Sequence, residues 1–290
     1  MQLNFFDHGR DTLLRNDMTQ AIERRDAASA RAAWQMLQQE LPKDELLPSA
    51  ARLIAALEHA ATAPFPDHDA LRQAREAALQ QIEPAARQVL GAPAAAAWMQ
   101  PLWRQLAQRA ARLGFAAACS DDHAAPLWLR GGDARAAADA VAAIPSWRRI
   151  PAPLDWAAEA SHGCHGLDAT WPLLAELAWL SPQRFQALAQ RLADPALDKL
   201  RRRFDACFEG DGSVADLAWF PAWVLTEKSS LCHLLEGTQA GTLSDPETGM
   251  RLLLELLRLE HQGRQHEMLD RRKALRQLNE SLYAAYMAPR

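Results

Sequence analysis

The sequence is poor in β-branched aliphatic residues: 4 valines and 5 isoleucines stand against 43 leucines in 290 residues. Strands favour β-branched side chains because these pack well on a pleated surface. Leucine and alanine, by contrast, lose little rotamer freedom in a helix. The scarcity argues against a β-sheet, and we expect an all-α protein built from stacked antiparallel helical hairpins.

Cysteine is also scarce. The four cysteines lie far apart and form no CxxC pair: Cys119, Cys164, Cys207 and Cys232. This spacing excludes a zinc ribbon and gives no sign of a disulfide framework. We therefore expect free thiols in a reducing cytosol.

Long apolar runs are missing as well. The longest stretch without a charged residue, 88–103, is too short to span a bilayer and contains glycine and proline. Near the start, Asp7 stands where a secretory leader would have its apolar core. These features predict a cytoplasmic protein without a membrane partner.

A basic surplus is absent. The formal net charge is −4, and 28 of the 32 basic residues are arginine. Nucleic-acid binders usually carry a basic surface, so a nucleic-acid partner is not expected. Arginine-bearing helices at 201–203 and 270–273 are the basis for that less favoured possibility. The arginine and alanine usage is typical of a GC-rich bacterial genome.

Helix start signals are clear in the second half of the chain. Ser181 precedes Pro182, and Asp194 precedes Pro195. A capping side chain followed by a first-turn proline is typical of a helix N-terminus, where the missing proline N–H has no partner to lose. Apolar residues then recur at helical spacing. The segment 181–210 is predicted to form two helices joined by a short turn.

One helix of the first half resembles a known repeat. In "RRDAASARAAWQMLQQELP", the residues Ala30, Trp34, Leu37 and Pro42 follow the spacing of the second helix of a tetratricopeptide (TPR) repeat. The segment "GGDARAAADAVAAIP", which ends at Pro145, is a looser echo. The resemblance implies an array of helical hairpins and, by analogy of fold alone, a protein-binding role.

A change in composition marks a boundary. The segment "IPSWRRIPAPLDW", residues 144–156, contains three prolines and interrupts the helical pattern. We place a domain boundary near residue 150. This gives an N-terminal helical array at 1–150 and a C-terminal one at 151–290, or a single continuous domain.

Tryptophan is plentiful in and after this segment. Trp147 and Trp156 flank Arg148 and Arg149. Tryptophan combines apolar area with a polar N–H and is enriched, with arginine, where proteins bind partners. We expect these four residues to be exposed and to form the partner-binding surface.

The motif "SHGCHG", residues 161–166, carries the most reactive side chains. His162, Cys164, His165 and Asp168 could ligate a metal ion, although the set is packed too tightly for a usual zinc pattern. Cys164 could instead serve as a nucleophile beside a histidine base. The simpler interpretation is a glycine-bounded loop that leads into a helix over 169–180.

No triad, phosphate loop or dinucleotide fingerprint is present, so no cofactor is expected. We expect a non-enzymatic interaction or adaptor protein that binds a protein or peptide on the concave face of a helical array. The alternative is an enzyme, or a metal or small-ligand binder, with an interhelical site near residues 161–168.

Overall fold

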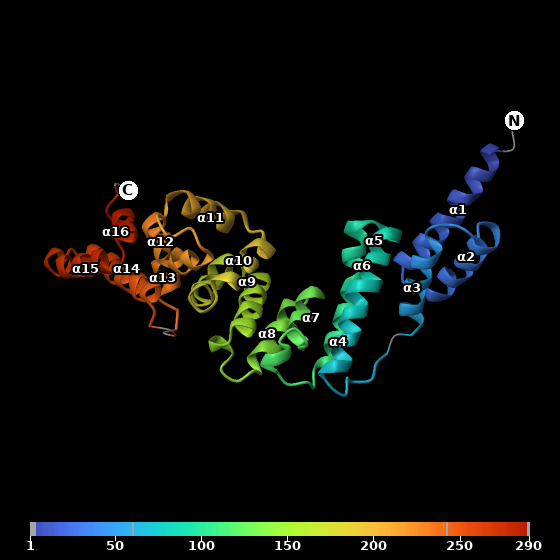
Figure 1. Ribbon diagram of the computed structural model, residues 1–290, viewed down its shortest axis with the longest axis horizontal. Coiled ribbons are helices and arrows are strands. Elements are labelled where there is room, and N and C mark those ends of the chain that lie inside the picture. Colours follow the sequence, from blue (N-terminus) through green and yellow to red (C-terminus); the bar gives the residue numbers. More distant parts are fainter. Residues whose placement is uncertain (1–3, 60, 240, 242, 289–290) are drawn as a thin grey trace. The chain divides into compact units, whose positions relative to one another are not determined.

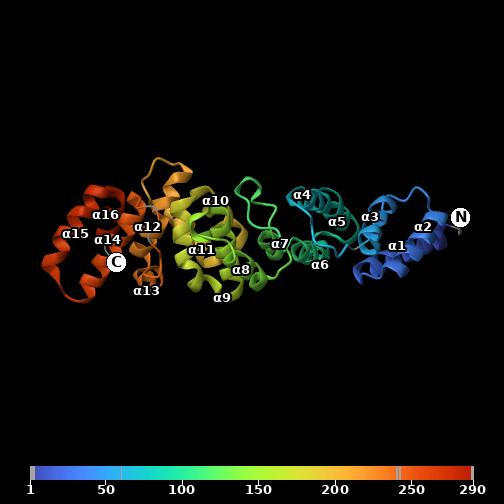
Figure 2. The same ribbon diagram turned by 90° about the horizontal axis from the view of Figure 1, so that it is seen from below.

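The computed structural model describes residues 4–59, 61–239, 241 and 243–288. Its regular elements are helices, and no strand occurs within those ranges (Figures 1 and 2). The expected all-α class is confirmed, while the stacking of hairpins into a TPR-like array stays a prediction. None of the helices in the described part of the chain combines the length and the apolarity needed to cross a membrane.

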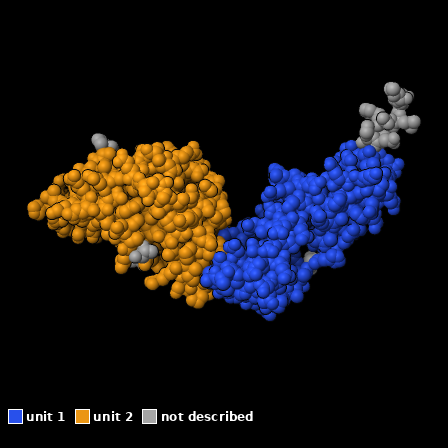
Figure 3. Space-filling view, in the orientation of Figure 1, with its two compact units in different colours: residues 1–133 blue, residues 134–290 orange. Residues whose placement is uncertain are grey.

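The chain divides into two compact units, Met1–Asp133 and Ala134–Arg290 (Figure 3). The composition change near residue 150 had suggested a boundary about one helix later. Residues 134–149 belong with the second unit because the helix at 134–142 packs against the long helix that begins at residue 151.

The first unit is built from seven α-helices within its described residues. They are α1 (Asn4–Glu23), α2 (Ala27–Glu40), α3 (Leu47–Glu58), α4 (His68–Ala77), α5 (Glu83–Leu90), α6 (Ala92–Ala110) and α7 (Ala124–Arg130). A π-turn, η1 (Ala78–Ile82), joins α4 to α5, and a short 3-10 turn, η2 (Ala117–Cys119), precedes α7. Helix α1 pairs with α2, α5 with α6, and α6 with α7.

Three of the residues that carry the TPR resemblance, Ala30, Trp34 and Leu37, lie in α2. Ala30 and Leu37 are fully buried. The indole Nε1 of Trp34 donates a hydrogen bond to the carbonyl of Leu47, the first residue of α3, at 2.9 Å. These contacts join α2 to α3, and the wider repeat remains an expectation.

The second unit contains nine α-helices in its described part. They are α8 (Ala134–Ala142), α9 (Pro151–Leu180), α10 (Pro182–Leu192), α11 (Pro195–Cys207), α12 (Phe220–Glu227), α13 (Cys232–Leu235), α14 (Asp245–His261), α15 (Gln265–Leu278) and α16 (Glu280–Met287). Three 3-10 turns connect them: η3 (Trp147–Arg149), η4 (Val214–Trp219) and η5 (Ser229–Leu231).

The predicted helix starts are confirmed at α10 and α11. The Ser181 hydroxyl accepts a hydrogen bond from the backbone N–H of Arg184, and Asp194 accepts from two N–H groups of the first turn of α11. Helix α9 packs against α8 and α10. The core beneath them is aromatic: the Phe220 ring lies 5.4 Å from Phe185 and 6.4 Å from Trp171, centroid to centroid.

Helix α9 corrects two expectations. Residues 161–165 are helical and do not form a loop, and the proline-rich segment supplies the first turn of α9, where prolines are tolerated. The backbone does break at Gly166, whose φ of 79° and ψ of −176° are accessible mainly to glycine. The Thr170 hydroxyl donates to the freed Gly166 carbonyl at 2.8 Å, which satisfies one group at the break.

Candidate functional site

The η3 turn carries three of the four predicted partner-binding residues. It begins after Ser146, which adopts a left-handed conformation with φ 54°, and it links α8 to α9. Trp147 and Arg148 are half-buried and Arg149 is exposed. The Arg148 guanidinium lies over the Trp147 ring, 5.3 Å from its centroid. The turn therefore presents an aromatic ring and two cations side by side.

The fourth predicted residue, Trp156, is not exposed. Its side chain retains only 5% of its accessible surface. Because residues 151–160 form the first turns of α9, Trp156 faces the core instead of a loop surface. The expectation that Trp156 is exposed was wrong.

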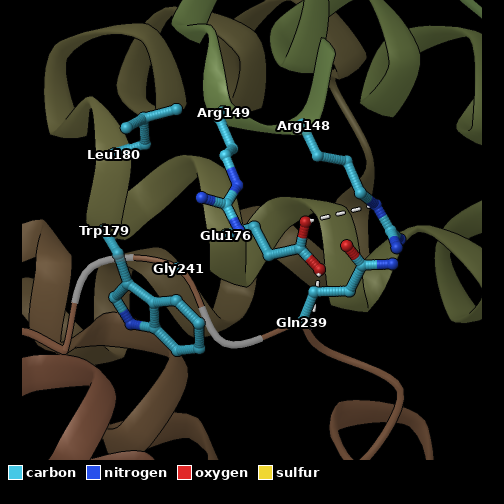
Figure 4. A pocket seen from close by; sticks show the side chains of 7 residues that line it. All are labelled: Arg148, Arg149, Glu176, Trp179, Leu180, Gln239 and Gly241. Carbon is cyan, nitrogen blue, oxygen red and sulfur yellow. Dashed lines mark hydrogen bonds and ion pairs between the residues drawn. The ribbon is translucent and has the colours of Figure 1, made fainter. Parts of the chain in front are cut away.

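Arg148 and Arg149 line a small cavity, named here the Arg149 pocket (Figure 4). Its volume is about 180 Å³. The two arginines descend from η3, and Glu176 lies below them, between them and Gln239, which comes from the segment after α13. The lining comprises Arg148, Arg149, Glu176, Trp179, Leu180, Gln239 and Gly241.

A buried carboxylate forms part of this pocket. Glu176 accepts a hydrogen bond from the backbone N–H of Gln239 at 2.8 Å. Its second oxygen lies 3.4 Å from Nε of Arg148, close enough for charge attraction but without hydrogen-bond geometry. Burial raises the pKa of Glu176, and the Gln239 N–H and the Arg148 charge partly oppose that rise. The positive charge of Arg148 is therefore balanced within the protein by the Glu176 carboxylate.

A second buried carboxylate holds the neighbouring backbone. Glu247, at the start of α14, is 1% exposed and accepts from the N–H groups of Gly241 and Leu243. It also pairs with Arg251 at 3.1 Å. The segment that carries Gln239 and Gly241 is thus tied to α9 and α14 by two carboxylates.

Arg149 differs from its neighbour because it has no internal counter-charge. Within the described residues its guanidinium makes no hydrogen bond or ion pair, although its backbone N–H donates to the Ser146 carbonyl at 2.8 Å. The pocket lining contains two cations and one carboxylate. Its local net charge is therefore positive, although the whole chain is acidic.

The opposite wall of the pocket is apolar. Trp179 is 8% exposed and Leu180 is half-buried. The indole Nε1 of Trp179 is buried and has no hydrogen-bond partner in the described part of the protein. Buried polar groups are nearly always paired, so this indole is held in place by packing at some cost in stability.

A second cavity, named here the Cys164 cavity, lies between α8 and α9. Its volume is about 320 Å³. Trp147 lines it from η3, and Cys164 and His165 line it from α9. Small side chains make much of its wall, namely Ala138, Ala142, Ala157 and Ala160. The η3 turn therefore contributes to both cavities.

The structure separates the residues proposed as metal ligands. His162 points to the start of α11, where its Nε2 lies 3.3 Å from a carboxylate oxygen of Asp194. Cys164 and His165 line the Cys164 cavity, and Asp168 is exposed. No group of three or more His, Cys, Asp or Glu side chains able to hold a metal ion occurs among the residues the structure describes. The tight helical spacing spreads the side chains around the axis instead of converging them.

The nucleophile interpretation finds only partial geometric support. Cys164 is exposed and shares its cavity with His165. Among the described residues, Cys164 and His165 form no hydrogen bond with each other. Cysteine activation requires a base within hydrogen-bond reach, so this pair lacks the arrangement of a prepared nucleophile.

Five lining residues escaped the sequence reasoning: Glu176, Trp179, Leu180, Gln239 and Gly241. For Glu176 a signal existed, because it is the only charged residue in the apolar run "WPLLAELAWL". A lone charge on such a helix is buried with a partner or faces a cavity. Trp179 packs in the core while also lining the pocket. Nothing local marks Gln239.

Comparisons with protein-family models, with curated proteins and with solved structures found no match for this chain.

Proposed function

We propose that the second unit is a non-catalytic binding module that takes an acidic segment of a partner protein at the Arg149 pocket. The observation that carries this proposal is the exposed Arg149 guanidinium, which has no counter-charge within the described residues and stands beside a cavity. An arginine in that position can donate several hydrogen bonds to a carboxylate from a fixed fork.

The unmatched positive charge of Arg149 indicates the class of ligand. Glu176 pairs with Arg148, so the Arg149 charge remains to be matched by an anion from outside. The carboxylate of an aspartate or glutamate side chain suits a planar guanidinium through two parallel hydrogen bonds. The positive pocket also stands out against an acidic chain, which favours encounter at this point through electrostatic steering.

The volume of the Arg149 pocket argues against a bound cofactor. Pockets for drug-sized ligands and cofactors usually measure about 300–1,000 Å³. The Arg149 pocket, at about 180 Å³, is smaller and suits a single side chain. A partner that inserts one acidic residue between Arg149 and the Trp179–Leu180 wall satisfies both the volume and the charge.

Nucleic acid is a weaker match. Binding to a nucleic-acid backbone draws its strength from many phosphate contacts made together. The Arg149 pocket offers one free guanidinium in a chain of net charge −4. A carboxylate ligand requires only that single group.

The test is selection of ligands from a random peptide library on the purified full-length chain. Bound peptides are compared on Arg149→Glu and on the control Arg202→Glu, which makes the same charge change at an exposed position of α11. Selected peptides should be enriched in aspartate and glutamate. Arg149→Glu should weaken their binding at least about tenfold, and Arg202→Glu should not. Equal loss in both variants, or selection without acidic residues, would refute the proposal.

A further inference from the structure

The Cys164 cavity lies next to the proposed acidic-peptide site in the chain and shares a wall element with it. Trp147 lines the Cys164 cavity, while Arg148 and Arg149 line the Arg149 pocket. All three residues belong to the single 3-10 turn η3. Adjacent residues of one turn therefore line both hollows.

The chemistry of the Cys164 cavity is different from that of the Arg149 pocket. Its two charged lining residues, Arg135 and Asp139, face each other one helical turn apart at 3.5 Å, so the rim is neutral overall. The remaining wall is mostly alanine, valine, leucine and the Trp147 ring. A mostly apolar hollow of about 320 Å³, whose Arg135 and Asp139 charges offset each other, favours an apolar side chain over a charged one.

We infer that the Cys164 cavity is a second subsite for the same partner, and that it takes a large apolar side chain. The partner segment then carries an acidic residue, bound by Arg149, and a leucine, phenylalanine or tryptophan, bound beside Trp147. This inference rests on the proposed function, because charge complementarity at Arg149 identifies the segment and continuity through η3 brings it to the cavity.

The alanines of α8 provide a way to fill the cavity without disturbing the core. Ala142 lines it and is itself exposed at the end of α8. Ala142→Trp would occupy part of the space that the partner needs. Its neighbour Ala143 is equally exposed and does not line the cavity, so Ala143→Trp is the matched control.

The experiment uses fluorescein-labelled alanine-based peptides that carry one glutamate and one phenylalanine at separations of one to six residues. Matched peptides carry the glutamate alone or the phenylalanine alone. Affinities are measured by fluorescence polarisation on the full-length wild-type chain and on the Ala142→Trp, Ala143→Trp and Arg149→Gln variants. At the best separation, phenylalanine should tighten binding about tenfold or more over glutamate alone, because it buries a large apolar side chain.

A second readout comes from the cysteines of the chain. Cys164 stands in the cavity and Cys207 is exposed elsewhere, outside the lining of both cavities. The rate of alkylation by iodoacetamide, measured for each cysteine by mass spectrometry, should fall at Cys164 when the two-residue peptide is bound. The rate at Cys207 should stay constant.

The outcomes separate the two proposals. Loss of the phenylalanine gain in Ala142→Trp but not in Ala143→Trp, with protection of Cys164, supports the second subsite. A phenylalanine that adds nothing, or Ala142→Trp and Ala143→Trp that behave alike, overturns the subsite while the Arg149 effect stands. Glutamate dependence that survives Arg149→Gln, or no binding by any peptide, overturns the proposed function and the subsite with it.

Discussion

Acidification should destabilise the first unit through His123, a buried histidine that caps α7. Its side chain is 6% exposed, and its Nδ1 accepts a hydrogen bond from the backbone N–H of Ala125 at 3.2 Å. The Phe115 ring packs edge-on against it, with centroids 6.1 Å apart. An Nδ1 that accepts a hydrogen bond cannot also carry a proton, so this environment requires the neutral imidazole.

The size of this loss of stability follows from the shifted pKa of His123. Burial, assisted by the positive charge of nearby His68, lowers the pKa of His123 from 6.5 to about 4. The folded state therefore binds a proton less readily than the unfolded state. Stability is fully present above pH 6.5 and is lost as the pH falls toward 4. Linkage gives a loss of about 2 kcal/mol between pH 8 and pH 5 from this group alone.

The variant His123→Asn isolates this contribution. Asparagine keeps an N-cap acceptor for the first turn of α7 but does not titrate. The free energy of unfolding should be measured by urea titration at pH 8 and pH 5 for both proteins. Hydrogen exchange of residues 124–130 assigns the change to the first unit. Wild type should lose about 2 kcal/mol more than His123→Asn over this interval.

A control removes an exposed histidine instead. His266→Asn, at an exposed position of α15, should retain the wild-type pH dependence. The same pH dependence in wild type and His123→Asn would show that His123 is not a buried neutral group, and the argument from desolvation would fail.

Two further predictions concern stability. Gly166→Ala should destabilise the second unit by about 1–3 kcal/mol in urea unfolding, because its φ of 79° strains any other residue although no atom lies within 4 Å of the added Cβ. Gly114→Ala, which has equal space and no positive φ, should change stability by less than about 0.5 kcal/mol, and equal effects would contradict the strain argument. Asp122→Asn should cost about 2 kcal/mol by the same assay, because this buried carboxylate pairs with Arg72 and Arg75 at 2.9 and 3.0 Å. The estimate lies below the ~3–5 kcal/mol of fully buried pairs since Arg72 is 41% exposed, and an unchanged stability would refute it.

The η3 turn shows how far local sequence signals reach. Arginine and tryptophan beside prolines pointed to a surface segment, and Trp147, Arg148 and Arg149 do line cavities. The same reasoning failed for Trp156. A proline ends a preceding helix but also starts a new one, and only the structure shows that Pro151 does the latter.

The glycines of the "SHGCHG" segment are a second case in which a local signal was ambiguous. Two glycines and two histidines suggest a loop, yet Gly163 is helical and only Gly166 breaks the backbone. Glycine tolerates both conformations, so its presence predicts neither. Only the structure shows that Gly166, and not Gly163, interrupts the helix.

Composition, apolar spacing and capping residues by themselves determined that the chain is helical and where α10 and α11 begin. These signals act within one or two turns, so they can be interpreted without knowing what lies across the core. The pockets were decided only by tertiary structure. The hydrogen bond from the Gln239 N–H to Glu176 joins residues 63 positions apart. The sequence around either residue contains no signal that predicts this contact. The burial of Glu176, the exposure of Arg149 and the hollow between them arise from that long-range packing.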